Sequence, residues 1–78
     1  MNSTNSDAFQ LSARKTVALN IRLQRVRRDL TQEELSIAAG INRGYVGQIE
    51  KASRAVSIDM LAKIAHALAV PVSELLKD

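Results

Sequence analysis

Cysteine is absent from the 78 residues of this chain. Its absence excludes disulfide bonds and thiolate metal sites, and nothing indicates an oxidising compartment. The N-terminus has no long apolar run, so a signal peptide is not expected. No apolar stretch approaches the roughly 20 residues that a membrane-spanning helix needs. We therefore expect a cytoplasmic protein without a membrane segment.

Strand patterns and catalytic motifs are also missing. No run of β-branched residues has the period of two that predicts a strand. The chain lacks a G-x-S-x-G motif and a phosphate-binding loop, and its one histidine, His66, has no cysteine to join it. We expect an all-α protein that is not an enzyme, with no metal, cofactor or small-molecule substrate.

The positive charge is concentrated in one segment, although the formal net charge is only +3. Charges cancel over residues 31–56 and sum to −1 over residues 57–78. Such a distribution favours an anionic polymer as a partner, and the alternative is a solvated helix face. Residues 14–30 contain one anion, Asp29, and six cations: Arg14, Lys15, Arg22, Arg25, Arg27 and Arg28.

The first twelve residues differ in composition from the rest. Residues 1–12 are mostly small and polar, which predicts a flexible N-terminal tail. Residues 13–78 form the predicted folded domain. Its first helix is expected from about residue 14 to residue 28, with Val17 and Ile21 among the apolar positions spaced by three and four.

Two shorter helices are predicted next. Thr31 and Glu34 form a T-x-x-E capping box, in which each side chain accepts a hydrogen bond from the other residue's backbone N–H. Gly40 suits a left-handed C-cap, so the second helix is expected to end there. Asn42 is expected to cap a third helix that runs to about Lys51.

The C-terminal third of the chain predicts two further helices. Ser57 is expected to cap a helix that runs from Ile58 to about Ala69. Pro71 prevents its continuation, and residues 72–77 are expected to form a short final helix. The apolar stripe of the fourth helix has the spacing i, i+3, i+4, i+7 and consists of Leu61, Ile64, Ala65 and Leu68.

The third helix has an outer face with little bulk. A glycine inside a helix costs about 1 kcal/mol relative to alanine, so two glycines require an explanation. Either a nucleic acid approaches this face closely, or the glycines are tolerated on a solvent face. Val46 and Ile49 are expected to face the core, whereas the outer face holds Arg43, Gly44, Gly47, Gln48 and Lys51.

Polar side chains on this helix suit contacts with DNA bases. The major groove admits an α-helix. In this groove, arginine can form two hydrogen bonds with guanine, and glutamine or asparagine can form two with adenine. Arg43 and Gln48 are the candidates for such contacts. Asn42 caps the helix, touches DNA, or does both. Tyr45 either packs in the core or reaches a thymine methyl group or a phosphate.

Other residues suit the phosphate backbone. Gln32 begins the second helix, where outward-pointing backbone N–H groups form a natural phosphate site. Ser53 and Arg54 follow the third helix and can hold the backbone on its far side. With Tyr45 and Lys51, they are the expected contacts that position the domain without specifying sequence.

At this point a family resemblance can be stated. The run TQEELSIAAGINRGYVGQIE resembles the helix-turn-helix of the phage-repressor family, the Cro/CI or XRE-like domains. The run SIDMLAKIAHALAVPVSELL resembles the fourth and fifth helices of that family, so the resemblance covers about Val17 to Leu76. More narrowly, INRGYVGQIEKASR resembles the small controller proteins of restriction–modification systems. Those are stand-alone domains that dimerise and switch their own operon.

The resemblance implies a five-helix repressor-like fold and roles for matching positions. Arg25 and Glu50 match a structural pair that bridges the first helix to the third. A bulky polar residue often stands where this chain has Gly44, so Arg43 would carry more of the specificity. Residues 51–53 replace a common basic-glycine turn. The DNA-facing positions, all but the first of them expected to face bases, are Gln32, Asn42, Arg43, Gly44 and Gln48.

A dimer is also implied. Family members bind as two-fold dimers whose recognition helices lie about 34 Å apart, one turn of B-DNA. The alternative for the surplus apolar residues near the C-terminus is a small core that covers itself. We expect a self-complementary dimer interface formed by Met60, Val70, Val72, Leu75 and Leu76.

The expected function is therefore transcriptional regulation by a homodimer that binds a two-fold symmetric operator in double-stranded DNA. The narrower resemblance implies autoregulation of a restriction–modification operon. The alternative is an antitoxin-type interaction module that also binds DNA. By analogy with activators of this type, residues around Glu33 and Glu34 would contact RNA polymerase. A membrane-surface role is not expected, since the arginines do not segregate opposite a broad aromatic face.

Overall fold

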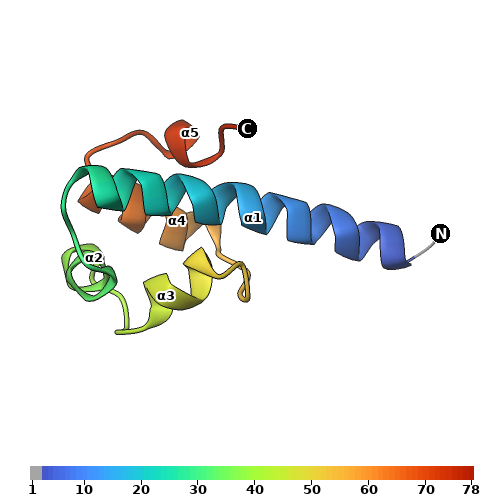
Figure 1. Ribbon diagram of the computed structural model, residues 1–78, viewed down its shortest axis with the longest axis horizontal. Coiled ribbons are helices and arrows are strands. Elements are labelled where there is room, and N and C mark those ends of the chain that lie inside the picture. Colours follow the sequence, from blue (N-terminus) through green and yellow to red (C-terminus); the bar gives the residue numbers. More distant parts are fainter. Residues whose placement is uncertain (1–2) are drawn as a thin grey trace.

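The computed structural model describes residues 3–78, and these residues form helices without strands (Figure 1). The predicted all-α class with five helices is confirmed. Within the described residues, no helix is both long and apolar enough to cross a membrane. The helices are α1 (Ser3–Arg27), α2 (Gln32–Ala39), α3 (Tyr45–Glu50), α4 (Ile58–Ala67) and α5 (Val72–Leu75).

Helix α1 corrects the predicted N-terminal tail. It begins at Ser3, so residues 3–12 are helical, and only Met1 and Asn2 of the predicted tail lie outside the described residues. Glycine and proline are absent before Gly40, so no strong helix breaker separates this segment from the rest of α1. The N-terminal half of α1 extends beyond the body in Figure 1, and the molecule measures 42 × 22 × 20 Å.

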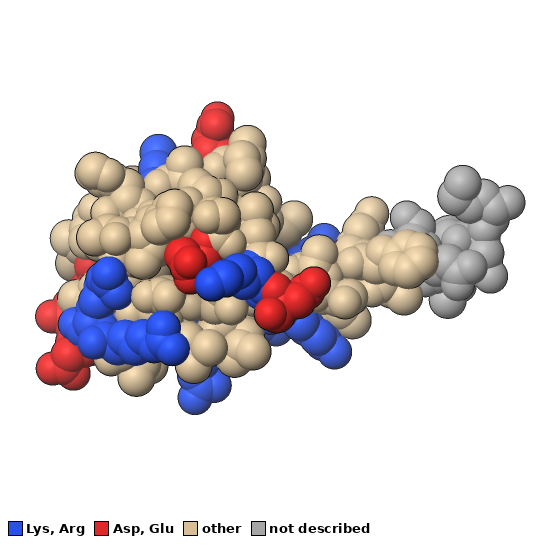
Figure 2. Space-filling model, turned by 90° about the horizontal axis from the view of Figure 1, so that it is seen from above, with Lys and Arg blue, Asp and Glu red and all other residues tan. Residues whose placement is uncertain are grey.

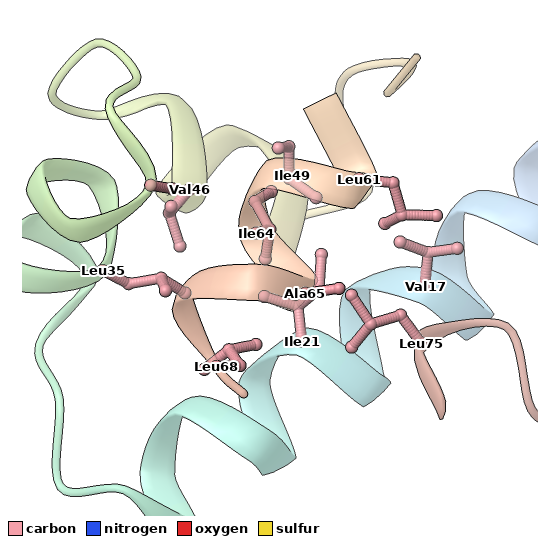
Figure 3. Packing of buried hydrophobic residues seen from close by; sticks show 11 residues of the cluster. Val17, Ile21, Leu35, Val46, Ile49, Leu61, Ile64, Ala65, Leu68 and Leu75 are labelled. Atoms are coloured by element: carbon pink, nitrogen blue, oxygen red, sulfur yellow. The ribbon is translucent and has the colours of Figure 1, made fainter. Parts of the chain in front are cut away.

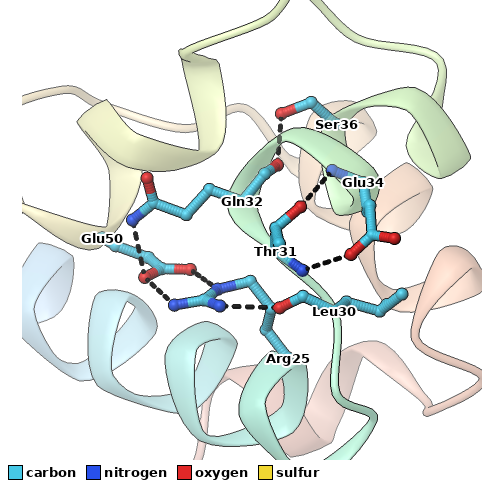
Figure 4. A network of polar contacts seen from close by, with 7 residues as sticks. All are labelled: Arg25, Leu30, Thr31, Gln32, Glu34, Ser36 and Glu50. Carbon is cyan, nitrogen blue, oxygen red and sulfur yellow. Dashed lines mark hydrogen bonds and ion pairs between the residues drawn. The ribbon is translucent and has the colours of Figure 1, made fainter.

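Helix α2 has the ends that the sequence predicts. The hydroxyl of Thr31 accepts a hydrogen bond from the backbone N–H of Glu34 at 3.0 Å. The carboxylate of Glu34 accepts one from the backbone N–H of Thr31 at 2.8 Å, as Figure 4 shows. Gly40 ends the helix in the left-handed conformation, with φ +69°. The capping box and the glycine C-cap are therefore confirmed.

The capping carboxyl makes α2 sensitive to acid. Hydrogen bonds with the backbone and the side chain of Thr31 hold the pKa of Glu34 below its ordinary value of 4.5. A lowered folded pKa stabilises the fold above the unfolded pKa, and this contribution is lost as the pH falls through the folded pKa. We expect Glu34→Gln protein to lose less stability than wild type below about pH 4.5 in urea unfolding. A carboxyl titration of Glu34 centred at or above 4.5, followed by NMR, would contradict this.

The start of α3 differs from the prediction. Its N-cap is Gly44, with φ +82°, rather than Asn42, and the helix begins at Tyr45. Gly44 therefore lies outside the helix interior, in a conformation that other residues rarely adopt. A Cβ atom on Gly47 would lie 3.1 Å from the side-chain oxygen of Gln32. Backbone conformation thus accounts for Gly44, and the neighbouring Gln32 side chain accounts for Gly47.

The two C-terminal helices occur in the expected order, but each ends before the predicted residue. The hydroxyl of Ser57 accepts a hydrogen bond from the backbone N–H of Met60 at 3.0 Å, which confirms the predicted cap. Helix α4 ends at Ala67 rather than near Ala69, and α5 ends at Leu75.

One core joins all five helices (Figure 3). Helix α1 packs against α3 and α5, α2 packs against α3 and α4, and α4 packs against α5. Every residue of the predicted α4 stripe is buried. The core residues drawn and labelled are Val17, Ile21, Leu35, Val46, Ile49, Leu61, Ile64, Ala65, Leu68 and Leu75.

The burial of Leu75 corrects part of the predicted dimer interface. Its side chain is fully buried within the core of its own chain and presents no surface to a partner. Of the other four residues, Met60, Val70 and Val72 are half-buried and Leu76 is 51% exposed. The self-covering core thus accounts for one of the five residues and leaves the others at its margin.

The turn after α3 holds an alanine in an unfavourable conformation. Ala52 has φ +57°, which costs an L-residue roughly 1–2 kcal/mol. We expect Ala52→Gly to raise the free energy of unfolding by about 0.5–1 kcal/mol, since part of the relief is offset by chain entropy. Ala62→Gly, inside α4, is the matched control and should lower it by about 1 kcal/mol. Denaturant unfolding in which both variants lose stability would contradict this expectation.

Candidate nucleic-acid interface

A buried ion pair sets the position of α3. The guanidinium Nε of Arg25 donates to Oε2 of Glu50 at 2.7 Å, and Nη2 donates to Oε1 at 3.1 Å. Only 14% of the Arg25 side chain and 5% of the Glu50 side chain are exposed. The hydrogen bond with Glu50 raises the pKa of Arg25 above its ordinary value. The predicted structural pair is confirmed, and it bridges α1 to α3.

The same pair also holds the start of α2 (Figure 4). Nη1 of Arg25 donates to the carbonyl oxygen of Leu30 at 2.7 Å, which fixes the chain just before α2. The side-chain amide of Gln32 donates to Oε1 of Glu50 at 3.2 Å. Gln32, expected at the DNA backbone, is exposed and is thus already oriented by a contact within the chain. The carboxylate of Glu50 thus binds side chains from α1 and α2, and Arg25 also holds the loop between these helices.

Five residues that the sequence singles out meet beside α3. They surround an open hollow of about 170 Å³ and are Asn42, Arg43, Tyr45, Gln48 and Arg54. All except the half-buried Tyr45 are exposed. The structure therefore brings the main candidates for base and backbone contacts onto one exposed surface.

Tyr45 and Arg54 form a stacked pair in this hollow. The guanidinium carbon of Arg54 lies 4.1 Å from the centroid of the Tyr45 ring, which is a cation–π geometry. The ring of Tyr45 also packs against the core, in agreement with one of the two alternatives for this residue. Nη1 of Arg54 donates to Oε1 of Gln48 at 2.8 Å. Sequence spacing gave no sign of this contact, because it spans a turn without regular periodicity.

Arg43 is an exposed cation of this surface. Its guanidinium pairs with the carboxylate of Glu33 on α2, and 75% of the Arg43 side chain and 53% of the Glu33 side chain are exposed. Exposed pairs of this kind contribute little and are easily exchanged for another anion. Glu33 and Glu34, the candidates for polymerase contacts, are thus both engaged within the chain.

The remaining candidates lie at the C-terminal end of α3. Lys51 is the exposed C-cap residue. The hydroxyl of Ser53 donates to the backbone carbonyl of Gln48 at 3.0 Å and so stabilises the turn; to contact a phosphate, its single O–H would have to turn away from that carbonyl. Lys51 and Ser53 follow the C-terminal end of α3, whereas Arg43 precedes its N-terminal end.

Charges of both signs are mixed on the face of the molecule that Figure 2 shows. In the view of Figure 2, which looks onto α1 and α5, lysines and arginines lie beside carboxylates with uncharged surface between them. This face lacks the continuous positive surface that a long polyanion needs. Nor do the described histidine, aspartate and glutamate residues include a group that could hold a metal ion.

Comparison with known families agrees with this arrangement. The sequence model of the family HTH_3, described as helix-turn-helix, matches residues 21–75, from the last two turns of α1 through α5. The chain belongs to this helix-turn-helix family. Its members of the XRE type are DNA-binding transcription regulators, and the resemblance inferred from the sequence is confirmed.

Similar proteins include controllers of restriction–modification systems. The control protein C.SmaI of Serratia marcescens is 32% identical over 71 residues, which cover 91% of this chain and 84% of that protein. The control protein C.BamHI of Bacillus amyloliquefaciens is 38% identical over 66 residues, covering 73% of this chain and 82% of that protein. The crystal structure of the restriction–modification controller C.AhdI from Aeromonas hydrophila matches with a TM-score of 0.79 at 33% identity, covering 82% of this chain and 97% of that one.

Proposed function

We propose that this protein binds double-stranded DNA in a sequence-specific manner as a homodimer and thereby regulates transcription from a two-fold symmetric operator. The observation that carries the proposal is the exposed polar surface beside α3, where Arg43, Gln48 and Arg54 meet. Its helix is held by the buried pair of Arg25 and Glu50. The similarity to proteins named as restriction–modification controllers favours an operon of that kind, including the protein's own gene.

Each part of the surface has a proposed role. Asn42, Arg43 and Gln48 contact base edges, and the backbone around Gly44 approaches the groove closely because no side chain stands there. The phosphate backbone is contacted by residues before and after α3 in the chain, and these contacts fix the register of the domain on DNA. The residues proposed for this are Gln32, Tyr45, Lys51, Ser53 and Arg54.

The dimer is proposed to form through the C-terminal margin of the core. Leu76 is 51% exposed, and Met60, Val70 and Val72 are half-buried. Two recognition helices must be about 34 Å apart to enter successive turns of one major-groove face. A two-fold contact at this margin would relate the two half-sites of the operator as an inverted repeat.

Leu76→Asp is expected to convert the dimer to a monomer, because a carboxylate would be buried at the contact without a partner. Sedimentation at tens of micromolar measures the change. Leu23→Asp is the matched control, since Leu23 is a leucine on α1 that is 45% exposed, and it should remain dimeric. A monomeric wild type, or equal effects of the two substitutions, would contradict the assignment.

Selection of bound sequences from a random DNA pool, repeated at several salt concentrations, tests the function as a whole. We expect a two-fold symmetric consensus and a binding constant that falls steeply with salt, by a logarithmic slope of about 0.9 for each phosphate contacted. Absence of enrichment together with a flat salt response would exclude sequence-specific DNA binding.

A further inference from the structure

The contact between Arg54 and Gln48 determines which atom of the glutamine amide faces DNA. The two side chains are 2.8 Å apart at Nη1 and Oε1. Arginine carries only donors, so the amide atom that faces the guanidinium must be the oxygen. The amide nitrogen, with its two N–H donors, is then left for the open side of the hollow.

Arg54 also makes a stacking contact that favours this position. Its guanidinium lies over the ring of Tyr45 at 4.1 Å, and that ring is half-buried against the core. Tyr45 is therefore a positioning residue, since it acts on the glutamine through the arginine. The three side chains, called here the Tyr45–Arg54–Gln48 unit, form a chain of contacts from the core to the exposed surface.

This geometry conflicts with the adenine contact expected of a free glutamine. That contact needs the glutamine oxygen to accept from the adenine N6 amino group while the nitrogen donates to N7. Oε1 has two lone pairs, of which Arg54 occupies one. An adenine amino group that used the other would lie beside the positively charged N–H donors of the guanidinium. The amino group of cytosine at N4 would meet the same donors. An amino group so close to a cation is electrostatically less favourable than a carbonyl oxygen, which accepts from the same donors.

We propose that the Tyr45–Arg54–Gln48 unit selects a keto base, guanine or thymine, at the position that faces Gln48. Guanine presents O6 and N7 as acceptors in the major groove, and thymine presents O4. The donors of Gln48 and Arg54 complement these acceptors, whereas amino bases are disfavoured. The inference rests on the proposed function and specifies the class of base that one residue of that surface recognises.

Selection from a random DNA pool with wild type, Gln48→Ala and Arg54→Met tests this directly. The position that faces Gln48 is the one whose preference disappears in Gln48→Ala. We expect guanine or thymine there in wild type. Arg54→Met keeps an unbranched stem but removes the donors, so Oε1 becomes free and adenine should rise relative to the keto bases by roughly fivefold or more.

Two further variants sharpen the test. Gln48→Glu keeps a partner for Arg54 but presents only acceptors, so cytosine should become preferred at the same position. Lys51→Met is the matched control for charge, because Lys51 is an exposed cation proposed to contact the phosphate backbone. It should weaken binding to all sequences alike and leave the base preference unchanged.

The outcomes separate this inference from the proposed function. Adenine or cytosine at the Gln48-dependent position in wild type, or a preference that Arg54→Met does not alter, would overturn the inference while a two-fold consensus still supports DNA recognition. A Gln48→Ala selection identical to wild type would also overturn it. No enrichment with wild type would overturn both.

Discussion

Replacing Arg25 by alanine is expected to lower the free energy of unfolding by roughly 3 kcal/mol, as removal of one partner from a buried ion pair does. The carboxylate of Glu50, with 5% of its side chain exposed, would lose the two hydrogen bonds that Arg25 donates. The carbonyl oxygen of Leu30 would lose the hydrogen bond from Arg25 as well. A domain of this size has only about 3–5 kcal/mol to lose, so the variant should keep no more than about 2 kcal/mol and be partly unfolded. Urea unfolding followed by circular dichroism measures the change.

Arg28→Ala is the matched control for this substitution. Arg28 is an exposed arginine whose side chain donates only to Gln24, four residues earlier, so its loss should change stability by less than about 0.5 kcal/mol. Arg25→Met combined with Glu50→Leu should recover part of the lost stability, because no charge is then left buried without a partner. A stable Arg25→Ala protein whose DNA binding has a reduced salt dependence would instead make Arg25 a phosphate contact.

Arg43→Ala is expected to relax the preference at one base pair in each half-site and to weaken specific binding by roughly 1–3 kcal/mol per half-site. The reason is that Arg43, with 75% of its side chain exposed, lies just before α3 and that Gly44 beside it supplies no side chain for recognition. Stability should not change, because the pair of Arg43 with Glu33 is exposed. Binding titrations against the selected site and its single-base variants measure the effect.

Glu33→Gln is the companion variant, since it releases Arg43 from its partner without removing the guanidinium. It should keep the base preference of wild type and bind DNA as tightly or more tightly. A uniform loss of affinity across all sequences in Arg43→Ala would make this residue a backbone contact instead.

Local signals predicted the ends of several helices correctly. Thr31 with Glu34, Gly40 and Ser57 each act through hydrogen bonds or backbone conformations within a few residues, and the structure confirms all three features. The failures were also local: Asn42 resembled a cap, but Gly44 begins α3 with a positive φ. A polar, small-residue composition resembled a tail in residues 3–12, although nothing there breaks a helix.

Periodicity predicted the core face of α4, but it could not predict which of the last apolar residues are buried. Leu75 and Leu76 are neighbours of the same type, and one is fully buried whereas the other is 51% exposed. Only the packing of α5 against α1 and α4 distinguishes them. A short helix offers too few turns for a sequence pattern to define its buried side.

The sequence by itself determined the helical class, the caps of α2 and α4 and the residue types near α3, because these depend on composition and on spacings of three or four residues. The tertiary structure alone decided how those side chains combine. Gln32 covers Gly47, and Arg54 lies on Tyr45 and holds the oxygen of Gln48. Such contacts depend on how separate helices and turns meet in space, and that arrangement changes Gln48 from an expected adenine contact into a proposed donor to keto bases.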